Sequence, residues 1–198
     1  MPNLSCLTVE PVGKPSGPMK IVVGLVLSVV AGCSLSLEAD DWPMVKEGIR
    51  LRFPQVRQIS TAQLASWLAH PDTLQPLLFD VRATQEYAIS HLRGARQMSP
   101  VQDEALPNEP LQDDPLAGGI ALDRPIVLYC SVGYRSARMA EMLQERGYTN
   151  VVNLEGSLFT WANESRPLVD AQGRSTTLVH PYDEACSGLL DPPFRSSE

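Results

Sequence analysis

Several features are scarce in this 198-residue sequence, and each shortage excludes a class of protein. Positive charge is not in excess: 16 Lys and Arg against 23 Asp and Glu give a formal net charge of −7, so we expect no nucleic-acid-binding surface. Cysteine and histidine are few, four and three, and none of them has the spacing of zinc ligands. We therefore expect no metal site, no cofactor and no disulfide scaffold.

Long apolar runs are also missing, apart from one short segment near the N-terminus. Residues 21–31 read IVVGLVLSVVA and follow Met19 and Lys20, as in the hydrophobic region of a signal peptide after its basic start. A membrane-spanning helix needs about 20 apolar residues, so a cleaved signal fits better than a permanent span. Glu10 and several prolines precede Met19, which favours Met19 over Met1 as the true start.

The apolar segment ends in Val30-Ala31-Gly32-Cys33, which resembles the lipobox of bacterial lipoproteins. In those proteins small residues precede a cysteine that is diacylated and becomes the new N-terminus. The resemblance implies that Cys33 is lipidated and that the chain is anchored to a membrane of the bacterial cell envelope, on the periplasmic or extracytoplasmic side. The alternatives are another signal, an inner-membrane anchor, or a core element of the domain.

What is present, 43% hydrophobic and 20% charged residues, fits one globular domain with additional segments. From Ile59 onward short apolar runs alternate with helical patterns, which predicts an α/β fold with a central parallel sheet and helices on both faces. Ser60 and Gln63 form a capping box at the start of one helix, and a second helix is expected from about Ser136 to Gly147. Buried strands are expected at three nearly continuous apolar runs, residues 77–81, 126–130 and 151–154.

These patterns divide the chain into four parts. Residues 1–32 are the expected signal segment, with 1–18 upstream of Met19, and residues 33–55 are a linker. The domain covers residues 56–169, and residues 170–198 form a tail that is too short for a core of its own. Within the domain, residues 100–125 carry five prolines and six acidic side chains, so we expect an exposed loop there.

The most informative stretch begins at Cys130, at the end of an expected buried strand, and continues through a short loop into a helix. Catalytic groups of open α/β sheets gather at that edge. The loop N–H groups and the positive end of the helix dipole favour a thiolate, and so does the fixed charge of Arg135. Gly133 supplies a residue that tolerates positive φ. We therefore expect Cys130 to be nucleophilic near neutral pH.

The stretch CSVGYRS from Cys130 to Ser136 resembles the active-site loop of the rhodanese family, Cys-x-x-Gly-x-Arg followed by Ser or Thr. The likeness extends upstream, through residues 80–82 (DVR), 86–87 (EY) and 90–95 (SHLRGA), and downstream, through 147–148 (GY), 154–156 (LEG) and Trp161. It covers about residues 56–168 and implies a three-layer rhodanese-like fold.

The resemblance also implies a reaction. Rhodaneses take a sulfane sulfur from a donor such as thiosulfate or a persulfide, hold it on the cysteine, and pass it to a thiol or cyanide. Cys130 would be the nucleophile, and Arg135 would bind the anionic end of the donor and stabilise the persulfide. The remaining loop residues would bind substrate through N–H groups: Ser131, Val132, Gly133, Tyr134 and Ser136.

Other residues near these motifs are interpreted as structural. Asp80 and Arg82 are expected to form a supporting ion pair, and Glu86 and His91 to act in turns and caps. Trp67 and Trp161 are expected in the core and Tyr134 at the mouth of the site. Cys186 is expected to be inert, with a disulfide to Cys130 or a resolving role as alternatives.

Two other functions remain open from the sequence. The domain could be a non-catalytic sulfur-binding or partner-docking module. It could also be a phosphatase or arsenate reductase on the same fold, although relatives with those activities usually have a loop one residue longer. Four residues separate Cys130 from Arg135, and this spacing favours sulfur.

Overall fold

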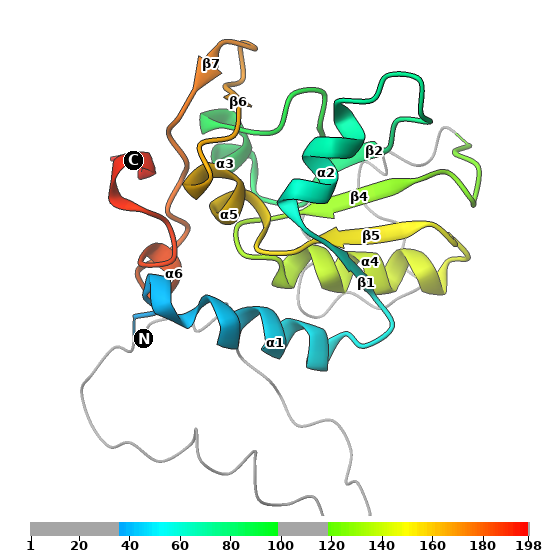
Figure 1. Cartoon of the computed structure of the whole chain (residues 1–198), viewed down its shortest axis with the longest axis horizontal. Coiled ribbons are helices and arrows are strands. Elements are labelled where there is room, and N and C mark those ends of the chain that lie inside the picture. The colour runs from blue at the N-terminus through cyan, green and yellow to red at the C-terminus, as the bar shows by residue number, and fades with distance from the viewer. Residues whose placement is uncertain (1–35, 99–118, 198) are drawn as a thin grey trace, which may run out of the picture.

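The computed structural model describes residues 36–98 and 119–197 and contains a five-stranded, wholly parallel sheet at its centre (Figure 1). The strand order is β1-β5-β4-β2-β3. The strands are β1 (Arg57–Ile59), β2 (Leu77–Asp80), β3 (Arg96–Gln97), β4 (Ile126–Tyr129) and β5 (Val151–Leu154). The neighbouring interior strands β4 and β5 are buried at every position, which explains why their sequences are almost continuously apolar.

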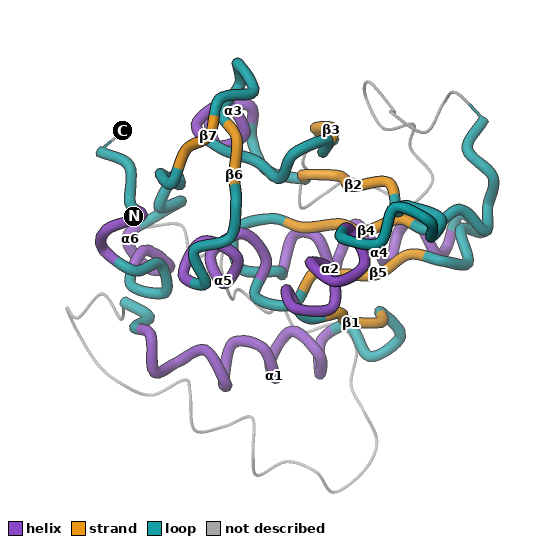
Figure 2. Tube along the Cα trace, turned by 45° about the horizontal axis from the view of Figure 1, so that its top comes forward, coloured by secondary structure: helices purple, strands orange, loops and turns teal. Residues whose placement is uncertain are grey.

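Helices cover both faces of this sheet, as the sequence predicted. Helices α2 (Thr61–Leu68) and α5 (Ser157–Asn163) lie on one face, and α4 (Tyr134–Glu145) lies on the other (Figure 2). Helix α3 (Thr84–Ile89) follows β2 at the carboxyl end of the sheet. The predicted α/β fold with a central parallel sheet and helices on both sides is confirmed.

The expected elements occur close to their predicted bounds. Ser60 caps α2, accepting the N–H of Gln63 at 3.1 Å, and the Gln63 side chain accepts the N–H of Ser60 at 2.8 Å. Helix α4 begins at Tyr134, two residues before the expected start, because Gly133 takes a left-handed φ of 114° and so serves as its N-cap.

The expected linker contains a helix that packs on the domain. Helix α1 (Trp42–Arg52) follows the short 3₁₀ turn η2 (Ala39–Asp41). Val45 and Ile49, one turn apart on α1, are buried, and Phe53 beyond its end is fully buried. The Phe53 ring lies edge-on to Tyr134 at the start of α4, with centroids 5.2 Å apart. The core therefore extends into residues that the sequence pattern had placed outside the domain.

The C-terminal tail also packs on the domain. It contains strand β7 (Ser175–Thr176), helix α6 (Glu184–Ser187) and the 3₁₀ turn η3 (Pro192–Phe194). Strand β7 pairs antiparallel with β6 (Leu168–Val169) at the end of the expected domain. Four of its side chains are fully buried: Val179, Cys186, Leu189 and Leu190. Leu37, just before α1, donates its N–H to the Ala185 carbonyl at 2.7 Å. The tail thus contacts both the domain and the residues that precede α1.

The cysteines differ in state. Cys186 is disulfide-bonded, whereas Cys130 is a free, buried thiol. A disulfide between these two residues, one of the alternatives considered from the sequence, is therefore wrong. The expected signal segment at residues 1–32, with Met19, lies outside the described residues, as do Cys33 and most of the acidic loop expected at 100–125.

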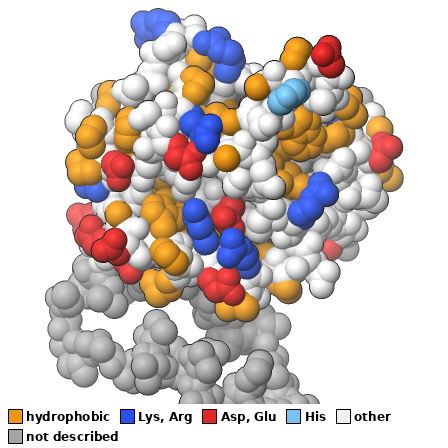
Figure 3. Space-filling view, in the orientation of Figure 1, with side chains coloured by type: hydrophobic (Ala, Val, Ile, Leu, Met, Phe, Trp, Pro, Cys, Tyr) orange, Lys and Arg blue, Asp and Glu red, His pale blue; other side chains and the backbone are white. Residues whose placement is uncertain are grey.

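The described surface carries charges of both signs. Lys and Arg side chains are interspersed with Asp and Glu on the face seen in Figure 3. Among residues 36–98 and 119–197, no helix is long and apolar enough to cross a membrane. The same residues contain no group of three or more His, Cys, Asp or Glu side chains arranged to hold a metal ion.

Candidate active site

Cys130 lies where β4 ends, at the carboxyl edge of the parallel sheet. Its side chain is 1% exposed, and the following Ser131 and Val132 are also buried. Gly133 then turns the chain into α4 with its φ of 114°, a conformation that L side chains rarely adopt. A cysteine, a tight turn and a helix start are thus brought together by consecutive residues.

The backbone of the loop is held by helix α5. The Leu158 N–H donates to the Cys130 carbonyl at 3.1 Å, and the Phe159 N–H donates to the Ser131 carbonyl at 3.0 Å. The Cys130 N–H donates to the Ser157 hydroxyl oxygen at 3.1 Å, and that hydroxyl donates to the Leu154 carbonyl at 3.0 Å. The position of the cysteine is therefore fixed from a second helix as well as from its own strand.

The environment of the Cys130 sulfur favours its thiolate. Burial alone would raise the pKa of Cys130, but the Arg135 charge, the Ser136 side chain and N–H, and the Gly133 N–H together lower the pKa below its ordinary value. The Gly133 N–H donates to Sγ at 3.1 Å. The loop therefore supplies a hydrogen bond to the sulfur that favours the thiolate over the thiol.

Arg135 is tied to a carboxylate on another element. Its Nη1 and Nη2 donate to the Glu86 carboxylate of α3, each at 2.9 Å. Nη2 also donates to the Ser131 hydroxyl at 2.9 Å, and that hydroxyl donates to Glu86 Oε1 at 3.1 Å. Burial alone would raise the pKa of Glu86, but its hydrogen bonds with Arg135 and the Arg135 charge lower it overall. The guanidinium beside Cys130 is thus fixed in a bidentate pair.

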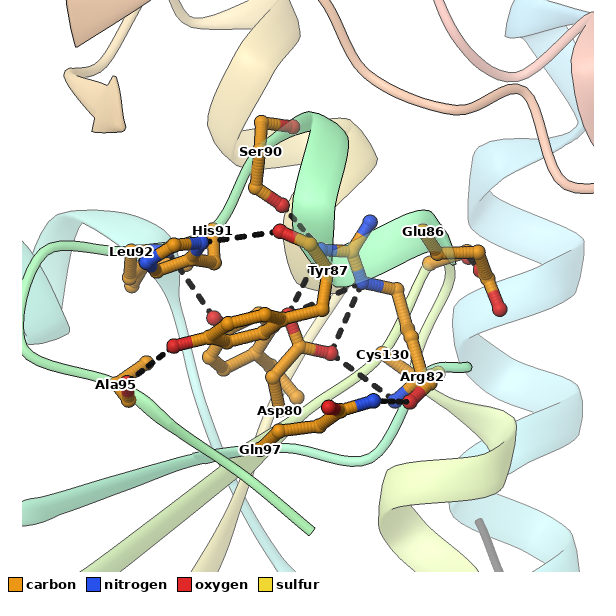
Figure 4. Close-up of polar contacts among 12 residues, drawn as sticks. Asp80, Arg82, Glu86, Tyr87, Ser90, His91, Leu92, Ala95, Gln97 and Cys130 are labelled. Atoms are coloured by element: carbon orange, nitrogen blue, oxygen red, sulfur yellow. Dashed lines mark hydrogen bonds and ion pairs between the residues drawn. The ribbon is translucent and has the colours of Figure 1, made fainter. Parts of the chain in front are cut away.

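A second ion pair lies entirely inside the same edge of the sheet (Figure 4). The Arg82 guanidinium donates through Nε to Asp80 Oδ1 at 2.9 Å and through Nη2 to Asp80 Oδ2 at 2.7 Å. Nη2 also donates to the Ser90 carbonyl, and Gln97 donates to the Arg82 carbonyl at 3.1 Å. Both charged side chains are fully buried. The geometry agrees with the predicted supporting pair that organises the loops after β2.

The remaining predicted residues have varied surroundings. Ser136 is fully buried at the start of α4, within the loop predicted to bind substrate. Tyr134 packs against Phe53, as described above. His91 stacks on Tyr87, with ring centroids 3.9 Å apart, and pairs with Val169 in an isolated bridge, so its contacts are structural. Trp161 is buried, and Trp67 is partly buried against the core.

Sequence reasoning missed three contributions to the site. Glu86 was interpreted as a cap, and it does accept the Ala83 N–H at 3.0 Å, but its pairing with Arg135 joins residues 49 apart in sequence. Ser157, whose hydroxyl accepts the Cys130 N–H, was given no role. Its φ of 48° lies in the left-handed region that favours glycine. Tyr182, from the tail, stacks on Arg135 and had no local signal.

Comparison with known proteins agrees with this geometry. The model of the Rhodanese-like domain family matches residues 60–164. A protein named sulfurtransferase from Allochromatium vinosum is 30% identical over 122 residues, 60% of this chain and 99% of the relative. The thiosulfate sulfurtransferase GlpE of Haemophilus influenzae is 30% identical over 92 residues, 46% of this chain and 78% of that protein.

A longer relative contains the similar region as one part. The probable adenylyltransferase/sulfurtransferase MoeZ of Mycobacterium tuberculosis is 29% identical over 109 residues, 55% of this chain but only 25% of that protein. Among solved structures, the rhodanese-like domain of the Alr3790 protein from Anabaena has a TM-score of 0.48 and 20% identity, covering 64% of this chain and 89% of that one. The family match spans more than half of the chain and includes Cys130, Arg135 and Glu86. The chain belongs to the rhodanese-like domain family.

Proposed function

We propose that this protein is a sulfurtransferase that carries a sulfane sulfur on Cys130. The observation that supports this most is the state of that thiol: a free cysteine at the sheet edge whose pKa is lowered by Arg135 and by loop N–H groups. Relatives named as sulfurtransferases, at about 30% identity, support the same class of reaction.

The proposed reaction has two displacements at sulfur. The Cys130 thiolate attacks the outer sulfur of thiosulfate or of a persulfide donor, the donor's S–S bond breaks, and sulfite or a thiolate leaves with the bonding electron pair. A thiol acceptor, as its thiolate, or cyanide then attacks the outer sulfur of the Cys130 persulfide. The electron pair of that bond returns to Cys130, so no external oxidant or reductant is needed.

The loop has a defined part in this scheme. The Arg135 charge and the Gly133 and Ser136 N–H groups stabilise negative charge on Cys130 before the reaction, and on the persulfide after it. Arg135 also attracts the anionic donor. The spacing of four residues between Cys130 and Arg135 favours a single sulfur over the tetrahedral oxyanion of a phosphatase or arsenate reductase.

The test is Cys130→Ser, because serine is nearly isosteric but a far weaker nucleophile at neutral pH. We expect thiocyanate formation from thiosulfate and cyanide to disappear, with the unfolding midpoint almost unchanged. Wild-type protein incubated with thiosulfate alone should gain the mass of one sulfur atom, and the variant should gain none. Full activity in the variant would overturn the mechanism.

The same measurements separate the alternative functions. A non-catalytic sulfur-binding module would gain the sulfur mass without turning over, and a docking module would do neither. A wild-type protein that hydrolyses aryl phosphates efficiently and transfers no sulfur would favour the phosphatase alternative.

We also propose that the chain is a lipoprotein anchored through Cys33 on the extracytoplasmic side of a bacterial membrane. The support is the sequence before Cys33 alone. Diacylation together with an N-terminal acyl chain would hold the domain stably, as more than one chain is required for that. In a bacterial host, Cys33→Ala should leave an unprocessed and unlipidated precursor. The anchor and the Cys186 disulfide of this structure exclude one another within one chain, because acylation uses the Cys33 thiol, cleavage removes Cys6, and Cys130 is free. The mature lipoprotein should therefore carry Cys186 as a thiol, and finding Cys33 bonded to Cys186 would exclude the anchor.

A further inference from the structure

The segment around Tyr182 lies outside the family match, which ends at residue 164. Residues before and after Tyr182 are nevertheless fixed by hydrogen bonds within the tail. Before it, Val179 is fully buried and pairs with η3: its N–H donates to the Phe194 carbonyl at 2.7 Å, and its carbonyl accepts the Ser196 N–H at 2.9 Å. After it, Asp183 caps α6 by accepting the Cys186 N–H at 2.8 Å. The position of Tyr182 is therefore set by the fold of the tail.

The backbone of Tyr182 has an unusual conformation. Its φ is 70°, in the left-handed region that a bulky L residue rarely adopts. The Tyr182 N–H donates to His180 Nδ1 at 3.0 Å, which helps to hold this turn. Such conformations persist where the surrounding structure requires them, and they gather at functional sites.

The turn directs the Tyr182 ring toward the active site. The Arg135 Cζ lies 4.3 Å from the centre of the ring, within the range of a cation–π contact. The edge of the same guanidinium is bound by Glu86 and by the Ser131 hydroxyl. Arg135 is therefore held on its edge by the domain and on its face by the tail. Its side chain is left 23% exposed.

We propose that Tyr182 is a positioning residue for sulfur transfer: its ring holds and partly desolvates the Arg135 guanidinium, so that the charge acts fully on the sulfur of Cys130. This rests on the proposed function in so far as Cys130 reacts as a thiolate. Electrostatic effects are stronger where water is excluded, and a freely rotating, hydrated arginine would stabilise both thiolate and persulfide less. The tail thereby becomes part of the active site.

The test compares side chains at position 182 that keep or lose the aromatic ring. All of them have a Cβ, so the backbone strain of the positive φ is the same in every variant. Tyr182→Phe retains the ring, and Tyr182→Leu retains bulk without it. Tyr182→Met serves in place of the leucine variant if that protein does not fold. Phe194→Leu is the matched control, because it removes a half-buried ring of the same tail. Among the described residues, the ring that stacks on Arg135 is that of Tyr182 and not that of Phe194.

The first readout is the pH dependence of Cys130 alkylation by iodoacetamide, with the modified residue confirmed by peptide mapping. We expect the apparent thiol pKa to rise by roughly half a unit in Tyr182→Leu, as fits the weakening of one cation–π contact, and to return to the wild-type value in Tyr182→Phe. Phe194→Leu should match the wild type. None of the variants substitutes the ionisable side chains around Arg135 or beside Tyr182, which are Glu86, Asp80, Arg82 and His180.

The second readout is sulfur transfer with thiosulfate. We expect kcat to fall severalfold in Tyr182→Leu and to be restored in Tyr182→Phe. Equal pKa and kcat values in all these variants, in a wild-type protein that does transfer sulfur, would overturn the positioning role. So would a Phe variant as impaired as the Leu variant. If the wild type transfers no sulfur but the thiol pKa still follows the ring, the proposed function fails and the positioning role stands.

Discussion

Two arginine–carboxylate pairs lie at the same edge of the sheet, and they differ in sequence separation and in exposure to solvent. Asp80 and Arg82 are two residues apart, and neither side chain is exposed. Glu86 and Arg135 are 49 residues apart, and Arg135 remains 23% exposed beside Cys130. The buried pair has no route to a substrate, whereas the second pair leaves part of its cation accessible. We therefore expect the first pair to control stability and the second to control reactivity.

The largest effect should come from breaking the buried pair. Asp80→Ala leaves the Arg82 charge buried without a partner, and such a loss typically costs about 3–5 kcal/mol. We expect the free energy of unfolding, measured by urea denaturation, to fall by this amount. The kinetics of the folded fraction should change little. A loss below about 1 kcal/mol would mean that Arg82 finds another partner and that the pair is not a required support.

Removing the arginine of the second pair should lower activity strongly and stability little. In Arg135→Ala we expect kcat/KM for thiosulfate to fall by about 10²–10³, the usual effect of losing one oxyanion-type donor, with KM raised and kcat lowered. Arg135→Lys should recover only part of this loss, because lysine keeps the charge but not the bidentate fork. Unchanged kinetics with a lowered melting temperature would make Arg135 purely structural.

A smaller effect should follow from neutralising the carboxylate of the accessible pair. Glu86→Gln removes a negative charge near both Cys130 and the anionic donor. We expect a severalfold lower KM for thiosulfate and alkylation of Cys130 that begins at lower pH. Asp80→Asn removes the same charge from the buried pair and should leave the alkylation profile unchanged. If the two variants shift that profile equally, the proposed difference between the pairs is wrong.

The smallest effect concerns stability in acid. The pKa of Glu86 in the folded protein lies below its ordinary value of 4.5, so its ionised form is favoured by folding. This contribution is present above the unfolded pKa and is lost as the pH falls through the folded pKa. Urea denaturation from neutral to acid pH should therefore show a smaller acid loss in Glu86→Gln than in wild type. Parallel curves would contradict this role of Glu86.

Much of the fold follows from local patterns in the sequence. The runs at residues 126–130 and 151–154 are apolar because their strands are buried on both faces. The cap at Ser60 and the turn at Gly133 depend on neighbouring residues only. The Cys130 loop could be found for the same reason, since its strand end, turn and helix start are consecutive.

The parts that were missed depend on distant contacts or on ambiguous patterns. Nothing near Glu86 indicates Arg135 as its partner, and nothing near Tyr182 indicates the same guanidinium. Val45 and Ile49 of helix α1 have helical spacing, but the segment around them was predicted to be a linker. Predicting α1 as part of the domain would have required the distant contact between Phe53, just after α1, and Tyr134 at the start of α4.

The hydrogen bonds from helix α5 to the Cys130 loop limit how far the loop backbone can move during the proposed reaction. Because the carbonyls of Cys130 and Ser131 are bound by N–H groups of α5, neither peptide unit can flip its oxygen toward the sulfur without breaking a hydrogen bond in the interior. The trans geometry of those peptides keeps the N–H groups of Ser131 and Val132 turned away from α5. In the proposed sulfur transfer, the loop backbone should therefore stay in place while Cys130 alternates between thiolate and persulfide, so that each sulfur atom meets the same N–H groups.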